Sequence, residues 1–167
     1  MYKRQDEQTL RSDKIFRHTL GESQDDDTLV YEEKDETFST YVYPSKSREY
    51  IMIGSTSTMA TEYRFLSSKT PLESFKVLQK RERGLEYSPS HVGDMFYIST
   101  NIDESTNFKL VKTPITSTEK SNWRDVIPHR EDVLIEDTDF FNDFMVIGER
   151  SNGLLKIRIK SWDGKED

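Results

Sequence analysis

The sequence of 167 residues contains no cysteine, which excludes disulfide bonds and thiolate zinc sites. It has no apolar run near the roughly 20 residues that a membrane-spanning helix needs, and Met1–Asp6 forms no apolar signal-peptide core. Basic residues are outnumbered, with 24 Lys and Arg against 31 Asp and Glu and a net charge of −7. Because phosphate binding needs a basic surface, we expect no nucleic acid partner. The lack of a spanning apolar run and of a signal-peptide core leads us to expect no membrane partner and a cytoplasmic location.

Alanine is also nearly missing, since Ala60 is the single one in the chain. Alanine is the best helix former, so a helical protein of this size would carry many. The chain instead has 15 Thr, 8 Tyr and 9 Phe, which suit pleated, half-buried surfaces. An apolar fraction of 33% is adequate for strands in which every second residue is buried. The composition therefore predicts an all-β protein.

Short strand-like runs recur along the chain with a regular period. Three sets of apolar residues are separated by 45 to 49 residues: Val30, Leu78 and Ile127; Ile53, Ile98 and Ile147; Phe65, Leu110 and Ile157. Four strands repeated every 45 to 50 residues are typical of β-propeller blades. A β-sandwich also has closely spaced strands but gives no reason for a four-strand period. We therefore predict a partial β-propeller of about three and a half four-stranded antiparallel blades.

The same period predicts the blade boundaries. Residues 1–36 would end one blade, 37–83 and 84–131 would form two complete blades, and 132–167 would begin the next. In this division the chain opens on a second strand, Tyr2–Gln5, and stops after a third strand, Leu155–Ile159, with Trp162–Gly164 as a turn. A closed propeller needs at least four blades. We therefore expect unpaired strand edges at both ends, which favour self-association.

Local signals add three predictions about the connections. Thr70–Glu73 reads as a capping box with proline at the first helical position, and Ser117–Ser121 recurs 47 residues later. We expect a single helical turn in each of these connectors. Asn152–Gly153 between two apolar strands predicts a hairpin with a type I′ turn.

Motifs for nucleophilic catalysis are incomplete. Gly54–Ser57 and Gly21–Ser23 lack the second glycine of a Gly-x-Ser-x-Gly elbow and are interpreted as hairpin residues. The histidines are His18 on a strand and His91 and His129 in turn-like segments, and they form no recognised metal spacing. We interpret all three as surface or hydrogen-bonding residues.

Acidic clusters are interpreted as solvated turns and charged surface. Asp25–Asp27 and Asp137–Asp139 lack the glycine and distal glutamate of a calcium loop. The run Glu32–Glu36 could supply paired carboxylates for glycoside hydrolysis, but charge runs usually face solvent. The aromatic residues Tyr31, Phe65, Phe96, Phe140 and Phe141 are interpreted as core residues. We predict no catalytic, cofactor-binding or metal-binding residue, and no cofactor.

A set of short segments spread over nearly the whole chain carries a resemblance to a known family. They are Phe16–Gly21, Leu29–Phe38, Ser45–Ser47, Thr61–Leu66, Arg81–Gly84, Glu86–Ser88, Gly93–Tyr97, Asn107–Leu110, Asn122–Trp123, Val126–Val133 and Glu149–Leu154. In their order and spacing they resemble the N-terminal propeller of oligopeptidase B (protease II) enzymes in the prolyl oligopeptidase family of serine peptidases. The resemblance implies a seven-bladed propeller that admits peptides to an α/β-hydrolase domain with a Ser-Asp-His triad and cleavage after Arg or Lys. No segment here matches the triad, so the chain is expected to be inactive alone.

Two other classes of function stay open. The chain could be a stand-alone interaction module that self-associates through the blade edges Tyr2–Gln5 and Leu155–Ile159. It could also be a carbohydrate-active propeller that uses Glu32 and Asp35. The first alternative predicts a stable oligomer, and the second predicts a glycosidase activity that depends on these two carboxylates.

Overall fold

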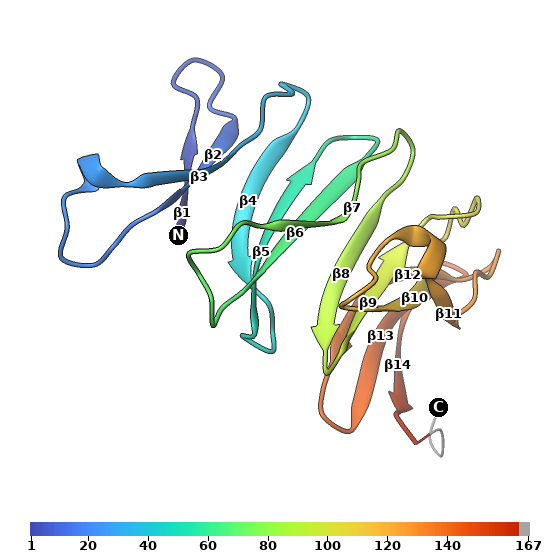
Figure 1. Ribbon diagram of the computed structural model, residues 1–167. Coiled ribbons are helices and arrows are strands. Elements are labelled where there is room, and N and C mark those ends of the chain that lie inside the picture. Colours follow the sequence, from blue (N-terminus) through green and yellow to red (C-terminus); the bar gives the residue numbers. More distant parts are fainter. Residues whose placement is uncertain (164–167) are drawn as a thin grey trace. The chain divides into compact units, whose positions relative to one another are not determined.

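The computed structural model describes residues 1–163, and they form fourteen strands and two short 3₁₀ helices (Figure 1). The strands build four antiparallel sheets in which neighbours in sequence pair with each other. The prediction of an all-β chain is confirmed. The chain divides into two compact units, Met1–Gly84 and the part from Leu85 onward. Among the described residues, no helix is long and apolar enough to cross a membrane.

The first unit contains the first and second sheets. The first sheet has three strands in the order β1 (Tyr2–Gln5), β2 (Ser12–Arg17) and β3 (Thr28–Glu32). The second sheet has four, in the order β4 (Ser39–Pro44), β5 (Tyr50–Thr56), β6 (Thr61–Ser67) and β7 (Lys76–Gln79). The short helix η1 (Gln24–Asp26) lies in the connection between β2 and β3.

The second unit repeats this plan. The third sheet has the order β8 (Tyr87–Val92), β9 (Met95–Thr100), β10 (Lys109–Pro114) and β11 (Arg124–Ile127), with helix η2 (Lys120–Asn122) before its last strand. The fourth sheet has three strands, β12 (Leu134–Phe140), β13 (Phe144–Ser151) and β14 (Leu154–Ser161). Each sheet is thus a meander, the topology of a propeller blade.

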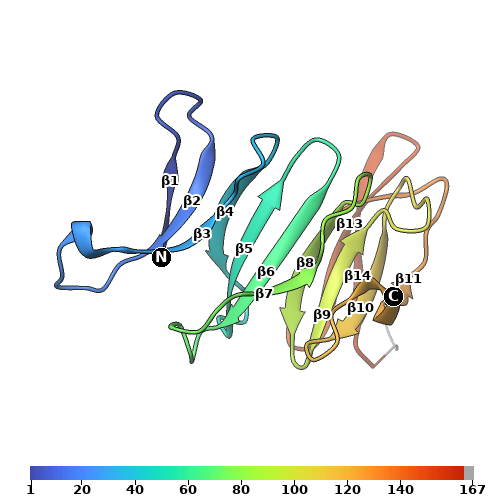
Figure 2. The ribbon, with the colours of Figure 1, turned by 45° about the horizontal axis from the view of Figure 1, so that its top comes forward.

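The third and fourth sheets of the second unit lie next to each other (Figure 2), and the core of this unit is formed by buried side chains between them. Its buried members come from both sheets: Leu110, Ile127, Ile135, Phe140, Met145 and Ile147. The Phe140 ring also contacts Tyr97 and Trp162, with centroids 5.1 and 6.3 Å away. This apolar contact holds the two sheets of the unit face to face.

The hairpin between β13 and β14 is confirmed as predicted. Asn152 and Gly153 both have positive φ angles, 52° and 77°, as a type I′ turn requires. The eight residue pairs from Ser151–Leu154 to Phe144–Ser161 follow without a register shift. Trp162 and Asp163 form a turn after β14, whereas Gly164 of the predicted turn lies outside the described residues.

The two predicted helical turns differ in outcome. Helix η2 supplies one turn of 3₁₀ helix in the second connector. The first prediction is wrong, because Thr70–Glu73 is a simple turn closed by the Glu73 N–H donating to the Thr70 carbonyl oxygen at 3.1 Å. The chain must be extended again by Lys76, which pairs with Phe65, so the helix does not continue.

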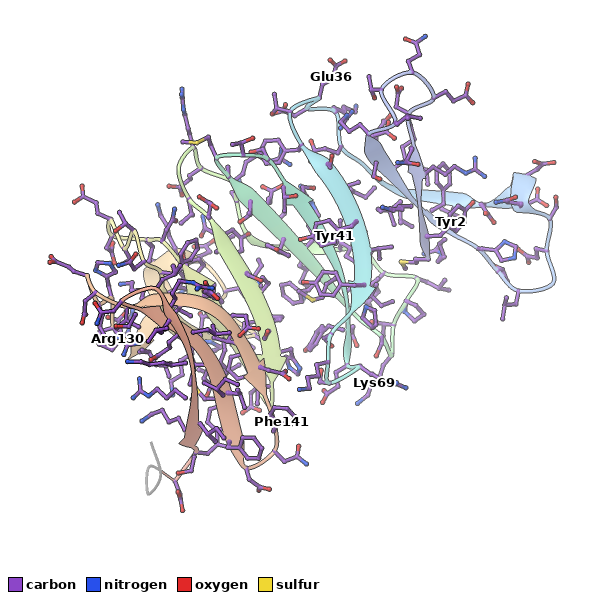
Figure 3. The ribbon with its side chains drawn as sticks, turned by 180° about the vertical axis from the view of Figure 1, so that it is seen from behind. Tyr2, Glu36, Tyr41, Lys69, Arg130 and Phe141 are labelled. Atoms are coloured by element: carbon purple, nitrogen blue, oxygen red, sulfur yellow. The ribbon has the colours of Figure 1, made fainter. Side chains whose placement is uncertain are left out.

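Two of the aromatic residues predicted for the core do not belong to it. Phe141 is exposed just beyond β12 (Figure 3), where it stacks on Phe144. Tyr31 is half-buried and directs its hydroxyl group to a carboxylate. The other three, Phe65, Phe96 and Phe140, are buried as predicted.

Candidate functional site

The main polar cluster of the first unit surrounds Arg81, which follows β7. Its partner Glu33 follows β3 and is only 4% exposed. The two residues are 48 positions apart, the same separation as Val30 and Leu78, so they occupy equivalent places after the outer strands of consecutive sheets. The regular spacing thus carried a signal for this pair that the sequence analysis did not use.

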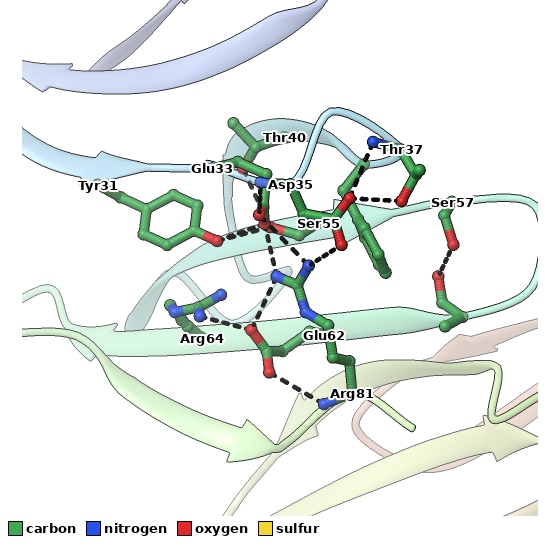
Figure 4. A network of polar contacts seen from close by, with 12 residues as sticks. Tyr31, Glu33, Asp35, Thr37, Thr40, Ser55, Ser57, Glu62, Arg64 and Arg81 are labelled. Carbon is green, nitrogen blue, oxygen red and sulfur yellow. Dashed lines mark hydrogen bonds and ion pairs between the residues drawn. The ribbon is translucent and has the colours of Figure 1, made fainter. Parts of the chain in front are cut away.

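The Arg81 guanidinium group lies between two carboxylates (Figure 4). It donates to Glu33 Oε2 at 2.5 Å and Oε1 at 3.3 Å, and to Glu62 Oε1 at 3.1 Å. The backbone N–H of Arg81 donates to the other oxygen of Glu62 at 2.9 Å. Its guanidinium also lies 3.9 Å from the ring centroid of Phe38, a cation–π contact. These contacts join the ends of β3, β6 and β7.

Further donors complete the surroundings of Glu33. The Tyr31 hydroxyl donates to its Oε2 at 2.6 Å, and the backbone N–H of Asp35 donates to its Oε1 at 3.1 Å. The Arg11 guanidinium holds the same connector from the other side, donating to the Glu33 and Phe38 carbonyl oxygens. The sequence predicted a solvated run at Glu32–Glu36. That is wrong for Glu33, because tertiary contacts pair its carboxylate.

The network shifts the pKa values of its members. Burial of Glu33 favours the neutral acid, but hydrogen bonds from Arg81, Tyr31 and the Asp35 N–H outweigh burial and lower its pKa from 4.5 to about 2. Burial, followed by the hydrogen bond to Glu33, raises the pKa of Tyr31. At neutral pH the carboxylate is therefore charged and the phenol neutral.

We predict that Glu33 makes the stability of the chain depend on pH. Because its folded-state pKa lies below the unfolded value, its contribution is complete above pH 4.5 and is lost as the pH falls towards 2. The shift corresponds to at most about 3 kcal/mol. We measure the free energy of unfolding by urea denaturation at several pH values between 2.5 and 7. In the variant Glu33→Gln, this free energy should decrease less steeply as the pH falls. The exposed control Glu36→Gln should keep the steeper decrease, and an equal effect of both variants would contradict the assignment.

A cavity of about 510 Å³ lies beside this network in the first unit. It is lined by Asp35, Thr37, Phe38, Ser57, Thr58, Met59, Ala60, Arg81, Glu82 and Arg83. Within this lining Phe38 and Ala60 are buried, whereas Asp35, Glu82 and Arg83 are exposed. Ser57 Oγ donates to the Ala60 carbonyl oxygen at 3.2 Å, so this hydroxyl is bonded to the backbone instead of a base. The lining contains no histidine that could activate it.

One histidine is paired with a buried carboxylate. His18 lies just after β2, and its Nδ1 is 2.7 Å from Asp27 Oδ1. Asp27 also accepts a hydrogen bond from the Tyr2 hydroxyl at 2.5 Å, and its side chain is 3% exposed. The interpretation of Asp25–Asp27 as solvated is therefore wrong for Asp27, whose carboxylate is sheltered. No described hydroxyl group bonds His18 Nε2, so the pair lacks the nucleophile of a triad.

The other histidines lie apart from this pair. His91 lies within β8, not in a turn as predicted; it is buried, and its ring is 5.5 Å from that of Phe96. His129 accepts a hydrogen bond from the Asn107 N–H at 3.4 Å. Within residues 1–163, no group of three or more His, Asp or Glu side chains is arranged to hold a metal ion.

The remaining acidic residues are also placed by the fold. Asp137–Asp139 lies in β12, so its prediction as a turn is wrong. Asp137 faces Gly148, where an added Cβ would lie 2.5 Å from the carboxylate, so the strands approach closely there. Glu32 and Asp35, the pair considered for sugar chemistry, are both exposed, and Asp35 accepts two hydrogen bonds from Thr37. The described polar clusters thus connect strand ends and include no activated nucleophile.

Consecutive antiparallel meanders, two of them four-stranded, define this chain as a β-propeller protein. Its residues 1–166 match the family model described as "Prolyl oligopeptidase, N-terminal beta-propeller domain". The chain therefore belongs to the prolyl oligopeptidase family, within its N-terminal propeller. The sequence-based predictions of a partial propeller and of this family are confirmed.

Similar proteins agree with this assignment. Dipeptidyl aminopeptidase BI of Pseudoxanthomonas mexicana is 39% identical over 166 residues, which is 99% of this chain and 23% of that protein. Protease 2 of Moraxella lacunata is 30% identical over 157 residues, 89% of this chain and 22% of that protein. The structure of oligopeptidase B from Leishmania major has a TM-score of 0.90 and 29% identity, and the match covers 96% of this chain and 22% of that one. The chain thus spans less than a quarter of the length of these relatives.

Proposed function

We propose that this chain is part of the propeller of an oligopeptidase B-like serine peptidase and controls the access of peptides to an α/β-hydrolase domain. The observation that carries the proposal is the family match over residues 1–166 on a fold of blade-like sheets. In this proposal the catalytic triad lies in the hydrolase domain. The blades have the boundaries 1–36, 37–83, 84–131 and 132–167. We also propose that the complete enzyme is cytoplasmic.

A rigid blade suits a gate that separates peptides from folded proteins. The Arg81 cluster supports this role, because it joins three strand ends of the first unit through charged hydrogen bonds. The net charge of −7 supports basic peptides as substrates, since an acidic surface attracts them over long range. We therefore propose cleavage after Arg or Lys by the complete enzyme.

A second specificity is favoured by one relative. The protein with 39% identity carries the name dipeptidyl aminopeptidase, which points to release of dipeptides from free N-termini. An enzyme carrying this propeller can be assayed with aminoacyl-arginine amides, in which Arg is the second residue, that have a free or an acetylated N-terminus. Cleavage of both substrates supports the endopeptidase, and cleavage of the free form alone supports the dipeptidyl aminopeptidase.

We predict that the purified chain alone does not hydrolyse arginyl or lysyl 4-nitroanilides, because the described residues contain no activated nucleophile. The assay should compare the chain with the same preparation after treatment with a serine-directed fluorophosphonate. Hydrolysis that co-elutes with the chain and is abolished by the fluorophosphonate would refute the proposal that the catalytic triad lies in a separate hydrolase domain. The flanking gene sequence should encode a Gly-x-Ser-x-Gly segment.

A further inference from the structure

The cavity of about 510 Å³ in the first unit is bordered by three loops. Its lining comes from the connector between β3 and β4, from the turn between β5 and β6, and from the segment after β7. Backbone hydrogen bonds hold these loops in place. The Gly84 N–H donates to the Met59 carbonyl oxygen at 2.8 Å, and the Phe38 N–H donates to the Asp35 carbonyl oxygen at 3.0 Å. Pockets for small ligands usually measure roughly 300–1,000 Å³ and are largely formed before binding, so this cavity has the size and the fixed walls of a binding site.

One part of the lining is apolar. Phe38 and Ala60 are buried, with exposed fractions of 6% each, whereas Met59 is 54% exposed. Methionine is a flexible, polarizable side chain that adapts its shape to a neighbouring group. An aliphatic or aromatic group placed against these three residues would remove apolar surface from water. The cavity therefore suits an apolar side chain.

The buried charges beside the cavity compensate one another. Arg81 binds the Glu33 carboxylate at 2.5 Å, and Arg64 binds the Glu62 carboxylate at 2.5 Å. Two cations thus meet two carboxylates, and these four charges sum to zero. The charge that a ligand meets in the cavity is therefore set by the exposed residues of its lining.

Those exposed residues carry a net negative charge, because Asp35 and Glu82 are acidic and Arg83 is basic. Asp35 Oδ1 accepts hydrogen bonds from the Thr37 N–H at 3.0 Å and the Thr37 hydroxyl at 2.7 Å. These bonds lower the pKa of Asp35, so its carboxylate is charged at neutral pH. Asp35 Oδ2 lies 4.0 Å from Arg81 Nη1 (Figure 4), which is too far for a hydrogen bond, and it can accept one from a ligand. The cavity therefore attracts a cation.

We propose that this cavity binds an extended segment of a basic peptide. An apolar side chain of the peptide packs against Phe38, Met59 and Ala60, and a guanidinium or ammonium group two residues further along pairs with Asp35. Side chains two positions apart in an extended chain point to the same side, so one segment supplies both groups. The inference rests on the proposed function, which brings peptides to this propeller. It goes beyond that function by assigning the first unit its own contact with the peptide.

The test uses the full chain and the blocked tripeptide acetyl-Leu-Gly-Arg-amide. Ala60 is the single alanine, so a chain isotope-labelled in its alanine methyl groups gives one NMR signal from the cavity lining. Titration with the tripeptide should shift this signal. In a chain labelled in its methionine methyl groups, the Met59 signal should also shift, whereas that of Met145 in the second unit should not.

Two matched peptides separate the charge from the apolar contact. Acetyl-Leu-Gly-Glu-amide should bind at least about fivefold more weakly, because its carboxylate is repelled by Asp35 and Glu82. Acetyl-Gly-Gly-Arg-amide should bind about tenfold more weakly, because it lacks the leucine side chain that the cavity buries. This comparison needs no variant and so does not depend on the folding of one.

Two variants should change the affinity for acetyl-Leu-Gly-Arg-amide in opposite directions. Asp35→Asn should weaken binding about two- to fivefold, because the amide oxygen can still accept the bonds from Thr37 but carries no charge. Arg83→Gln should strengthen binding about twofold, because it removes a cation from the lining. The control Glu36→Gln, exposed and outside the lining, should leave the affinity unchanged. A loss of folding would weaken binding in both lining variants and cannot produce opposite effects.

The Ala60 signal decides between the outcomes. A signal that stays unchanged on titration, or equal binding of the arginine and glutamate peptides, would overturn the proposal. Either result leaves the proposed function standing, because binding is read without peptidase activity. Hydrolysis by the chain alone would contradict the proposed function and leave the peptide site standing.

Discussion

Replacing Arg81 with methionine is expected to lower the free energy of unfolding by about 3–5 kcal/mol, because the loss of one partner from a buried ion cluster leaves an uncompensated charge. Two carboxylates accept hydrogen bonds from this guanidinium group, those of Glu33 and Glu62. Glu62 also pairs with Arg64 at 2.5 Å, so the uncompensated charge falls mainly on Glu33. Both glutamate side chains are at least 93% buried, with exposed fractions of 5% and 7%. Methionine keeps most of the aliphatic volume over Phe38, so the variant mainly removes charge and hydrogen bonds. Urea denaturation followed by tyrosine circular dichroism measures the change.

The matched control is Arg83→Met, two residues away on the rim of the cavity. Arg83 is exposed, so the change should stay within about 0.5 kcal/mol. The double variant Glu33→Gln with Arg81→Met should lose less than the sum of the single losses, because the neutral amide no longer needs a cation. Equal destabilisation by Arg81→Met and Arg83→Met would show that the cluster does not stabilise the fold.

Leu110→Ala is expected to destabilise the second unit by about 2–5 kcal/mol, since it removes buried methyl groups and leaves a cavity. Leu110 is fully buried between the third and fourth sheets, in contact with the cluster that includes Ile127 and Ile147. Both tryptophans, Trp123 and Trp162, belong to this unit. Tryptophan fluorescence during urea denaturation therefore reports the change where it occurs.

The control for this prediction is the same substitution on the surface. Leu20 is 93% exposed, so Leu20→Ala should alter the free energy of unfolding by less than about 0.5 kcal/mol. A small effect of Leu110→Ala would mean that the contact between the two sheets contributes little to stability. Comparing the two variants separates the loss of buried packing at Leu110 from the effect of a leucine-to-alanine change as such on the free energy of unfolding.

Local pattern was enough to predict most of the fold. The near absence of alanine indicated strands, and the spacing of Ile53, Ile98 and Ile147 reflected the repetition of the sheets. Asn152–Gly153 predicted its own turn, because only small or flexible residues adopt positive φ angles easily. At Thr70–Glu73 the chain forms a simple turn instead of the predicted single helical turn, because it must be extended again where Lys76 pairs with Phe65.

The candidate site was less accessible to prediction. Charged residues in a run look alike in sequence, although Glu33 is buried and its neighbour Glu36 is exposed. Asp27 looked like its exposed neighbours Asp25 and Asp26, yet it is sheltered by Tyr2 and His18. Which member of a cluster is buried depends on residues far away in the chain, and no local pattern contains that information.

The sequence by itself determined the strand class, the repeat and the membership in a peptidase family, because each of these depends on periodic or ordered local features. The tertiary structure alone decided that Arg81 joins Glu33 to Glu62 and that Tyr2 and His18 shelter Asp27. The physical reason is that pairing and burial are long-range properties. They arise when strands separated by tens of residues come together, and only then does a charge acquire a partner.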